Sequence, residues 1–179
     1  MSNDQELAIR EAICACFGLQ SGSDQALAFV RKAYEEPEVN PQPARSVDVV
    51  YWHVATDFGA DPASYNTESI STGINKPSSV RFLPFLLTVV CYGPACEANA
   101  HAIRSAMYFD GYGQPRSVLR KRSIYPVPNP PPITLLYEPE GSLWRRRADV
   151  VIPLRILDTF ASASARNSIQ VTPAVIIHR

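Results

Sequence analysis

The chain has 179 residues and carries 17 basic and 17 acidic side chains, so it lacks the net charge that would attract nucleic acid or an anionic membrane surface. At this length about 70% of the surface of the unfolded chain becomes buried, and we expect a single domain, 1–179. No segment approaches the roughly 18 to 20 consecutive apolar residues of a membrane span, and the polar start lacks the apolar run of a signal peptide. We therefore expect a cytosolic protein with no membrane partner.

The charges are distributed unevenly along the chain. Residues 1–68 hold 4 basic and 11 acidic side chains, and residues 69–179 hold 13 basic and 6 acidic side chains, which gives formal charges of −7 and +7. Such a split permits head-to-tail contact between an acidic face of one copy and a basic face of the next, which is how heterologous rings form. An ordinary solvated surface is the simpler explanation, and both stay open.

Two helices are predicted in the N-terminal region, 3–36. Asn3 and Glu6 form a capping-box-like start, followed by apolar residues at helical spacing. Ser23 can cap the second helix, and Pro37 ends it. The apolar stripe of the second helix consists of Leu27, Val30, Ala33 and Tyr34.

A linker with three prolines, 37–45, leads into a sheet-and-helix body, 46–179. Val, Tyr and Trp side chains in 47–56 predict the first strand of that body. The polar segment 58–76 is expected to form either a long hairpin arm or a flexible loop that a partner orders.

The near-continuous apolar run 80–92 predicts a central strand covered on both sides, with Pro84 near its start or at a bulge. An alanine-rich pattern at 95–108 predicts a helix whose small side chains press closely on the sheet. Between them lies a structural joint formed by Tyr92, Gly93 and Pro94. Pro94 is expected in the first turn of the helix, because its missing N–H has no intrahelical partner there.

Five prolines in the seven residues 126–132 predict a stiff polyproline-II spacer or a ligand for an aromatic groove. A long β-hairpin is expected from strands 133–137 and 144–157, joined by a turn at 138–142. A closing strand is expected at 169–177. These elements predict the α+β class, with a mixed, mainly antiparallel sheet packed by two to three helices.

The best candidates for an enzymatic nucleophile or a zinc site are Cys91, Cys96 and His101, because thiolates and imidazoles serve both purposes. Their spacing matches no familiar ligand pattern, and buried structural thiols in a reducing compartment are the simpler interpretation of the cysteines. His53 and His178 lie in strand patterns and are expected to be structural.

Three carboxylates, Glu138, Glu140 and Asp149, are candidates for the divalent-metal cluster of a nuclease if they converge across the hairpin. Salt bridges to the neighbouring arginines explain them more simply. No glycine-rich phosphate loop, GxSxG elbow or HExxH motif is present in the sequence. We therefore expect no catalytic residue, no metal and no cofactor.

A nucleic-acid binder remains a rival hypothesis because of two basic clusters. They are Arg120-Lys121-Arg122 and Arg145-Arg146-Arg147. If both clusters lie in strands, the alternation of side chains divides each triplet between two faces, which weakens the prediction of a continuous patch.

Three segments of the chain carry a resemblance to a known family. They are F-L-P-F-L-L-T-V-V-C-Y-G-P-A-C-E-A-N-A-H-A-I-R at 82–104, Y-P-V-P-N-P-P-P at 125–132 and L-L-Y-E-P-E-G-S-L-W-R-R-R-A-D at 135–149. Together with the final strand they resemble the tailed-phage neck or tail terminator family, which includes prophage tail completion proteins. The resemblance covers about residues 46–179.

The resemblance implies a non-enzymatic virion protein, a subunit of a homo-oligomeric ring, expected to be a hexamer, at the head-proximal end of a phage tail. Such a ring ends polymerisation of the tail tube protein and offers a surface to the head-completion or connector protein. DNA passes through its lumen without specific binding, and assembly takes place in the cytoplasm of the bacterial host. As the inter-subunit or lumen-facing surface we expect Trp144, Arg145, Arg146, Arg147 and Asp149.

Overall fold

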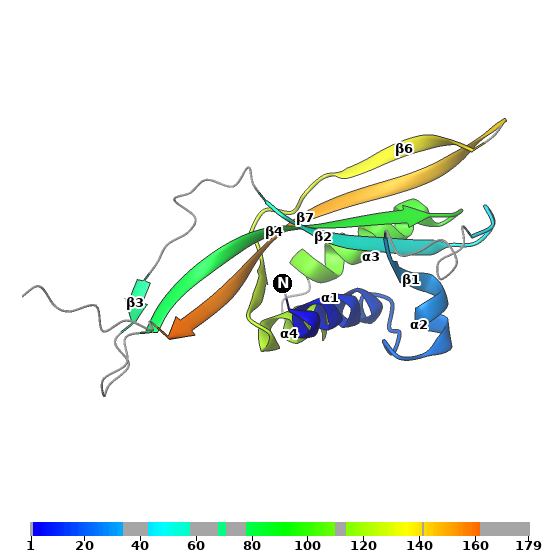
Figure 1. Cartoon of the computed structure of the whole chain (residues 1–179). Helices are drawn as coiled ribbons and strands as arrows, with labels where there is room; N and C mark the ends of the chain where they lie inside the picture. Colours follow the sequence, from blue (N-terminus) through cyan, green and yellow to red (C-terminus); the bar gives the residue numbers. More distant parts are fainter. Residues whose placement is uncertain are drawn as a thin grey trace, which may run out of the picture.

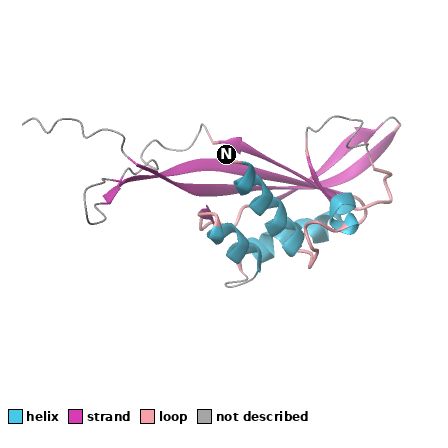
Figure 2. Cartoon of the chain, turned by 60° about the horizontal axis from the view of Figure 1, so that its bottom comes forward, coloured by secondary structure: helices cyan, strands magenta, loops and turns pink. Residues whose placement is uncertain are grey.

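The structure is a computed structural model that describes residues 2–33, 43–57, 68–70, 78–109, 114–140 and 142–161. Within these residues the fold contains a seven-stranded sheet and four helices. All four helices lie on one face of the sheet (Figures 1 and 2), and we call the opposite face the open face. The predicted α+β class is confirmed, with four helices in place of two to three.

Two long antiparallel strands form the centre of the sheet. They are β4 (Ser78–Tyr92) and β7 (Leu143–Ala161), paired from Ser78 opposite Ala161 to Tyr92 opposite Arg147. Along the outer side of β4 lie β3 (Glu68–Ile70) and β2 (Val49–Thr56), and along the outer side of β7 lie β5 (Ile124–Pro126) and β6 (Ile133–Glu140). The short strand β1 (Val30–Lys32) runs parallel to β2 at one edge.

Pro84 lies in the middle of β4, so the prediction that it sits near the strand start or at a bulge was wrong. Its carbonyl oxygen accepts a hydrogen bond from the N–H of Asp57 at 3.2 Å. In an antiparallel ladder the N and the C=O of a residue point to the same neighbour. The missing donor of Pro84 therefore faces Asp57, just past the end of β2, so the proline costs only the second bond of this last pair.

The helices begin at caps close to the predicted places. In α1 (Asn3–Ala15) the capping box uses Ser2 and Gln5, one residue earlier than predicted. Ser23 caps α2 (Asp24–Phe29), accepting from the N–H of Ala26 at 3.2 Å. The others are α3 (Cys96–Tyr108) and α4 (Gln114–Lys121); the sequence pattern did not predict α4.

The second helix is shorter than predicted, because Val30 leaves the helical pattern and begins β1. Val30 pairs with Val50 of β2 and is buried. A β-branched residue fits this paired, buried position better than a helix end. Tyr34 and Pro37, which were expected to complete the helix, lie outside the described residues.

The core lies between the helices and one face of the sheet. It contains apolar side chains from α1, α2, α3 and α4 as well as from β1, β2, β4, β5 and β7 in one cluster. In β4 the buried residues Leu87, Val89 and Cys91 alternate with residues of the open face. The prediction that this strand is covered on both sides was therefore wrong for the described part of the chain.

The hairpin of β6 and β7 is longer than predicted. β6 continues to Glu140 and β7 starts at Leu143, so the predicted turn at 138–142 consists largely of paired strand, with Glu138 opposite Arg145. Residues 127–132 connect β5 to β6 without helix or strand, as expected of a spacer. Of the segment 58–76, residues 68–70 form β3, while the predicted strand 169–177 lies outside the described residues.

Candidate assembly surface

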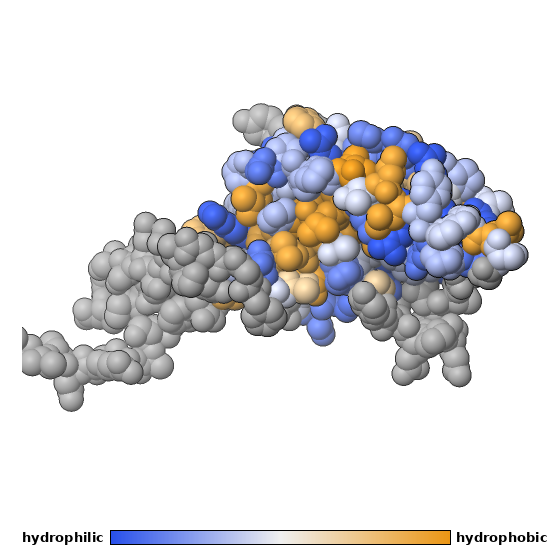
Figure 3. Space-filling model, turned by 90° about the horizontal axis from the view of Figure 1, so that it is seen from above, coloured by the Kyte–Doolittle hydropathy of each residue, from blue (hydrophilic) through white to orange (hydrophobic). Residues whose placement is uncertain are grey.

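The open face of the sheet carries an apolar band. It is formed by Tyr51 of β2, Leu86 and Val90 of β4, and Val151 and Pro153 of β7. Val151 is 41% exposed, and the other four are neither fully buried nor fully exposed. Figure 3, which views the molecule from above, shows apolar side chains gathered in the middle of this face. The water-facing side of an antiparallel sheet is ordinarily polar, so this band has the character of a contact surface.

A charged network adjoins the band at the end of β4. The Arg147 guanidinium donates to Asp149 at 2.7 Å and lies 3.4 Å from Glu138, whose carboxylate also accepts from the Tyr92 hydroxyl at 2.7 Å. Burial lowers the pKa of Arg147, but its hydrogen bond and charge attraction to Asp149 outweigh that effect and raise it. Burial, together with Glu138, raises the pKa of Tyr92 to about 12. The network therefore holds these side chains in one arrangement.

Arg145 is buried although it is charged, with only 5% of its surface exposed. Its guanidinium lies 4.6 Å from the centre of the Tyr92 ring, a cation–π arrangement. Its Nε and Nη2 atoms have no hydrogen-bond partner within the described part of the chain. Because β4 ends at Tyr92, no strand lies beside β7 at this position on that side.

A cavity of about 240 Å³ lies beside β7 at Arg145. It is lined by Arg45, Gly93, Pro94, Trp144, Arg145 and Arg146. The structure thus brings part of the predicted joint next to part of the predicted assembly interface. Of the lining residues, Arg45 donates to the Glu140 carboxylate at 2.8 Å, and Arg146 pairs with Glu97 of α3.

The five predicted interface residues do not form a single patch. Arg145, Arg147 and Asp149 point to the open face, whereas Trp144 and Arg146 point to the face that carries the helices. Trp144 is 67% exposed near the tip of the hairpin. The interface predicted from sequence is therefore divided between the two faces. The sequence did not reveal the apolar band, because the exposure of these side chains depends on which face of the sheet the helices cover.

The joint is tightly packed around Gly93, which has a φ of +105°. A Cβ atom at this position would lie 2.7 Å from Cα of Asp48 and 2.8 Å from the carbonyl oxygen of Val47. The Asp48 carboxylate accepts from the N–H of Ala95, the residue that precedes α3, at 2.8 Å. Pro94 lies one residue before this N-cap, so its predicted place in the first helical turn was wrong.

The candidate nucleophile and zinc residues differ in their burial. Cys91 and Cys96 are fully buried, and burial raises the pKa of the Cys91 thiol, while His101 is exposed. His53 is half-buried in β2, and His178 lies outside the described residues. Within the described ranges no three His, Cys, Asp or Glu side chains gather as metal ligands.

The three candidate carboxylates of a nuclease do not gather as a cluster. Glu138 and Asp149 both contact the Arg147 guanidinium, which lies between them as a cation. Glu140 is paired instead with Arg45. Salt bridging, the simpler interpretation from sequence, describes the geometry of these side chains.

The two basic clusters lie on different parts of the molecule. Arg120 and Lys121 are exposed in the last turn of α4, so the argument that strand alternation divides both clusters was wrong for this one. The helix packs beside β5, which pairs with residues 154–156 of β7. From there to Arg146 the strand rises about 27 Å. The two clusters therefore do not form a continuous basic surface.

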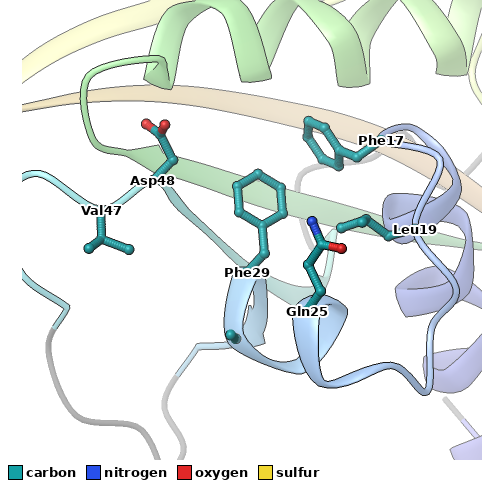
Figure 4. Close-up of a pocket in the computed structure, with 7 residues that line it drawn as sticks. Phe17, Leu19, Gln25, Phe29, Val47 and Asp48 are labelled. Atoms are coloured by element: carbon teal, nitrogen blue, oxygen red, sulfur yellow. The ribbon is translucent and has the colours of Figure 1, made fainter.

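A second cavity, of about 330 Å³, lies between the end of α1, the helix α2 and the start of β2 (Figure 4). Its lining is largely apolar and includes Phe17 and Phe29, whose rings meet edge to face at 4.9 Å. Of its seven lining residues only Asp48 carries a charge, and one oxygen of that carboxylate already accepts from Ala95. The cavity thus lacks the converging polar groups typical of a cofactor or substrate site.

None of the helices in the described ranges has the length and apolar content needed to cross a membrane. No protein-family model matches the sequence, and no curated protein matches it.

Proposed function

We propose that this chain is a subunit of a homo-oligomeric ring that caps the tail tube of a phage or prophage and offers a surface for joining the head. The observation that carries this proposal is the apolar band on the open face of the sheet. The resemblance of residues 46–179 to tail terminator proteins supplies the biological setting. The ring acts by geometry: it occupies the exposed end of the tube, blocks further addition of tube subunits and permits docking of the head.

The dimensions of the open face support an interface between subunits. Residues 84–92 of β4 rise about 27 Å, and the three strands β2, β4 and β7, which run side by side over nearly this whole length, add about 14 Å at about 4.8 Å spacing, an area of about 390 Å². A stable protein interface buries about 800 Å² on each partner. The open face thus supplies about half of such an interface, and the exposed hairpin adds Leu136 and Leu143 on the same face.

Substitution of Val151 by Asp tests the proposal. Val151 is 41% exposed, so the variant should keep its fold, but a carboxylate in the apolar band opposes burial against another subunit. Leu7→Asp is a matched control, because Leu7 is 49% exposed on α1, in the helical layer. Sedimentation and negative-stain imaging with purified tail tubes should show rings or capped tubes for the wild type and the control, and neither for Val151→Asp.

Two outcomes contradict the proposal at different levels. A wild-type protein that stays monomeric at every concentration and never caps tubes refutes the ring function. A Val151→Asp variant that assembles as well as the wild type removes the apolar band as the interface. Circular dichroism of each variant separates lost assembly from lost folding.

A further inference from the structure

The cavity beside β7 at Arg145 has a lining rich in guanidinium groups, because Arg45, Arg145 and Arg146 all contribute to it. We call it the arginine cavity. Two of these cations have carboxylate partners. Arg45 donates to Glu140 at 2.8 Å, and Arg146 pairs with Glu97 of α3. Both side chains keep N–H groups beyond those used in these pairs, since a guanidinium has five.

Arg145 is the lining cation that no carboxylate of the described residues neutralises. Its Nε and Nη2 atoms are buried without a hydrogen-bond partner there. Glu138 lies directly opposite in the strand pairing, but its carboxylate accepts from Tyr92 and contacts Arg147. The Tyr92 ring compensates the Arg145 charge only through a cation–π contact. Burial of a charge without a hydrogen-bonded counter-charge is costly, so an anion supplied from outside would bind favourably here.

We propose that the arginine cavity binds a carboxylate, which pairs with the Arg145 guanidinium. A carboxylate matches the planar fork of a guanidinium and can accept two parallel hydrogen bonds from it. The volume of about 240 Å³ exceeds the roughly 150 Å³ of a cavity that admits benzene, so a short stem fits with the carboxylate. Trp144 is largely exposed and lines the cavity, so the cavity reaches the surface and offers an apolar wall to that stem.

The surrounding charges favour a carboxylate over a phosphate group. Three lining guanidiniums and the two carboxylates paired with them leave one positive charge. The network of Arg147 beside the cavity holds two carboxylates, Glu138 and Asp149, against one guanidinium, so it repels further negative charge. A single negative charge neutralises Arg145, whereas phosphate at neutral pH brings more than one.

Saturation-transfer NMR on butyrate tests the site in the full-length protein, at neutral pH and constant ionic strength. Butyrate supplies a carboxylate on a short apolar stem, and butyramide has nearly the same shape without the charge. Butyrate should receive saturation from the protein and butyramide should not. Because this measurement observes the small molecule, it works whether the protein is a monomer or a ring. Inorganic phosphate should displace butyrate less effectively than acetate does.

Substitutions at Arg145 assign the binding to this cavity. Arg145→Met should weaken butyrate binding by about tenfold or more, since it removes a charged hydrogen-bond donor. Arg120→Met is the matched control, because it removes an exposed cation of α4 and should leave binding unchanged. Arg145→Lys keeps the charge without the planar fork, so it should retain part of the affinity, and it replaces the methionine variant if circular dichroism shows that variant unfolded.

A second measurement identifies the source of the carboxylate. An acidic side chain of a partner protein predicts that Arg145→Met loses ring formation or tube capping, and that butyrate inhibits both in the wild type. A free organic acid predicts that neither the substitution nor butyrate changes assembly. The carboxylate site itself does not depend on the proposed ring function.

Three outcomes refute the inference. The first is an absence of saturation transfer to butyrate at every concentration. The second is equal binding of butyrate by the wild type and the folded Arg145 variants, or equal binding of butyrate and butyramide. The third is stronger binding of phosphate than of carboxylates, which contradicts the preference for a single charge. None of these results bears on the ring function, which sedimentation and imaging of tail tubes test separately.

Discussion

Replacing Gly93 by Ala should unfold the joint that connects β4 to α3. The φ of +105° at Gly93 costs an L-residue about 1 to 2 kcal/mol. The added Cβ would also lie 2.4 Å from a carboxylate oxygen of Asp48, 2.7 Å from its Cα and 2.8 Å from the Val47 carbonyl oxygen. Two of these three atoms belong to the backbone, so rotation of a side chain cannot relieve the contact.

The magnitude follows from these contacts. Overpacking of this kind costs about 1 to 3 kcal/mol. Displacement of Asp48 also weakens its hydrogen bond to Ala95, and a hydrogen bond to a charged group contributes about 1.5 to 3 kcal/mol. Allowing for partial relaxation, we expect Gly93→Ala to lower the free energy of unfolding by about 4 kcal/mol, which corresponds to a fall in Tm of about 8 to 16 °C.

Two other glycines provide a graded series for the same thermal and urea unfolding assays. Gly18 has a φ of +67° with no atom within 4 Å of an added Cβ, so Gly18→Ala should cost only the backbone strain, about 1 to 2 kcal/mol. Gly22 has neither strain nor a close neighbour, and Gly22→Ala should change stability by no more than about 0.5 kcal/mol. If Gly93→Ala is no more destabilising than Gly18→Ala, the steric argument is refuted.

Three further predictions concern the charged network and the thiols. Arg147→Ala should lower the free energy of unfolding by about 2 kcal/mol, because it leaves the mostly buried Asp149 unpaired. Arg146→Ala removes only an exposed ion pair and should lower it by less than about 1 kcal/mol. Urea denaturation measures both values. The pKa of Tyr92 is raised to about 12, so the folded state keeps a phenolic proton that the unfolded chain loses above pH about 10. The free energy of unfolding should therefore fall as the pH rises from about 10 to about 12. Tyr92→Phe should reduce part of this fall, measured as the midpoint of urea denaturation at each pH. In the native protein at pH 8 the thiols should react slowly with a disulfide reagent, and they should become reactive on denaturation. Burial raises the pKa of Cys16 to about 12, so rapid modification of Cys16 in the native protein would contradict the structure.

Patterns of local periodicity predicted most of the elements correctly. Helix α1 and helix α3 follow from apolar and small residues at helical spacing, and β2 and the β6–β7 hairpin follow from alternation and turn residues. The fold class follows from the order of these elements.

The errors concern features that depend on long-range pairing. Val30 fits a helical stripe in sequence and becomes a strand only through its pairing with Val50. Pro84 occurs within β4 because the adjacent strand β2 ends at Thr56, which no local pattern reveals. The apolar run in β4 suggested burial on both sides, since the sequence does not tell whether an apolar face contacts helices or another molecule.

The candidate site was predicted only in part for the same reason. The residues around Arg145 were selected as an interface, but strand alternation divides them between two faces. The burial of Arg145 depends on the place where β4 ends beside β7, a property of strand register rather than of composition.

The mass of the particle that this protein forms, alone and on purified tail tubes, tests the ring function most directly. Mass photometry across a range of concentrations, combined with negative-stain imaging of tube ends, measures both states. The account predicts a closed ring, expected to contain six copies, in solution or on the end of the tube. A strict monomer at every concentration that leaves tube ends uncapped would contradict it.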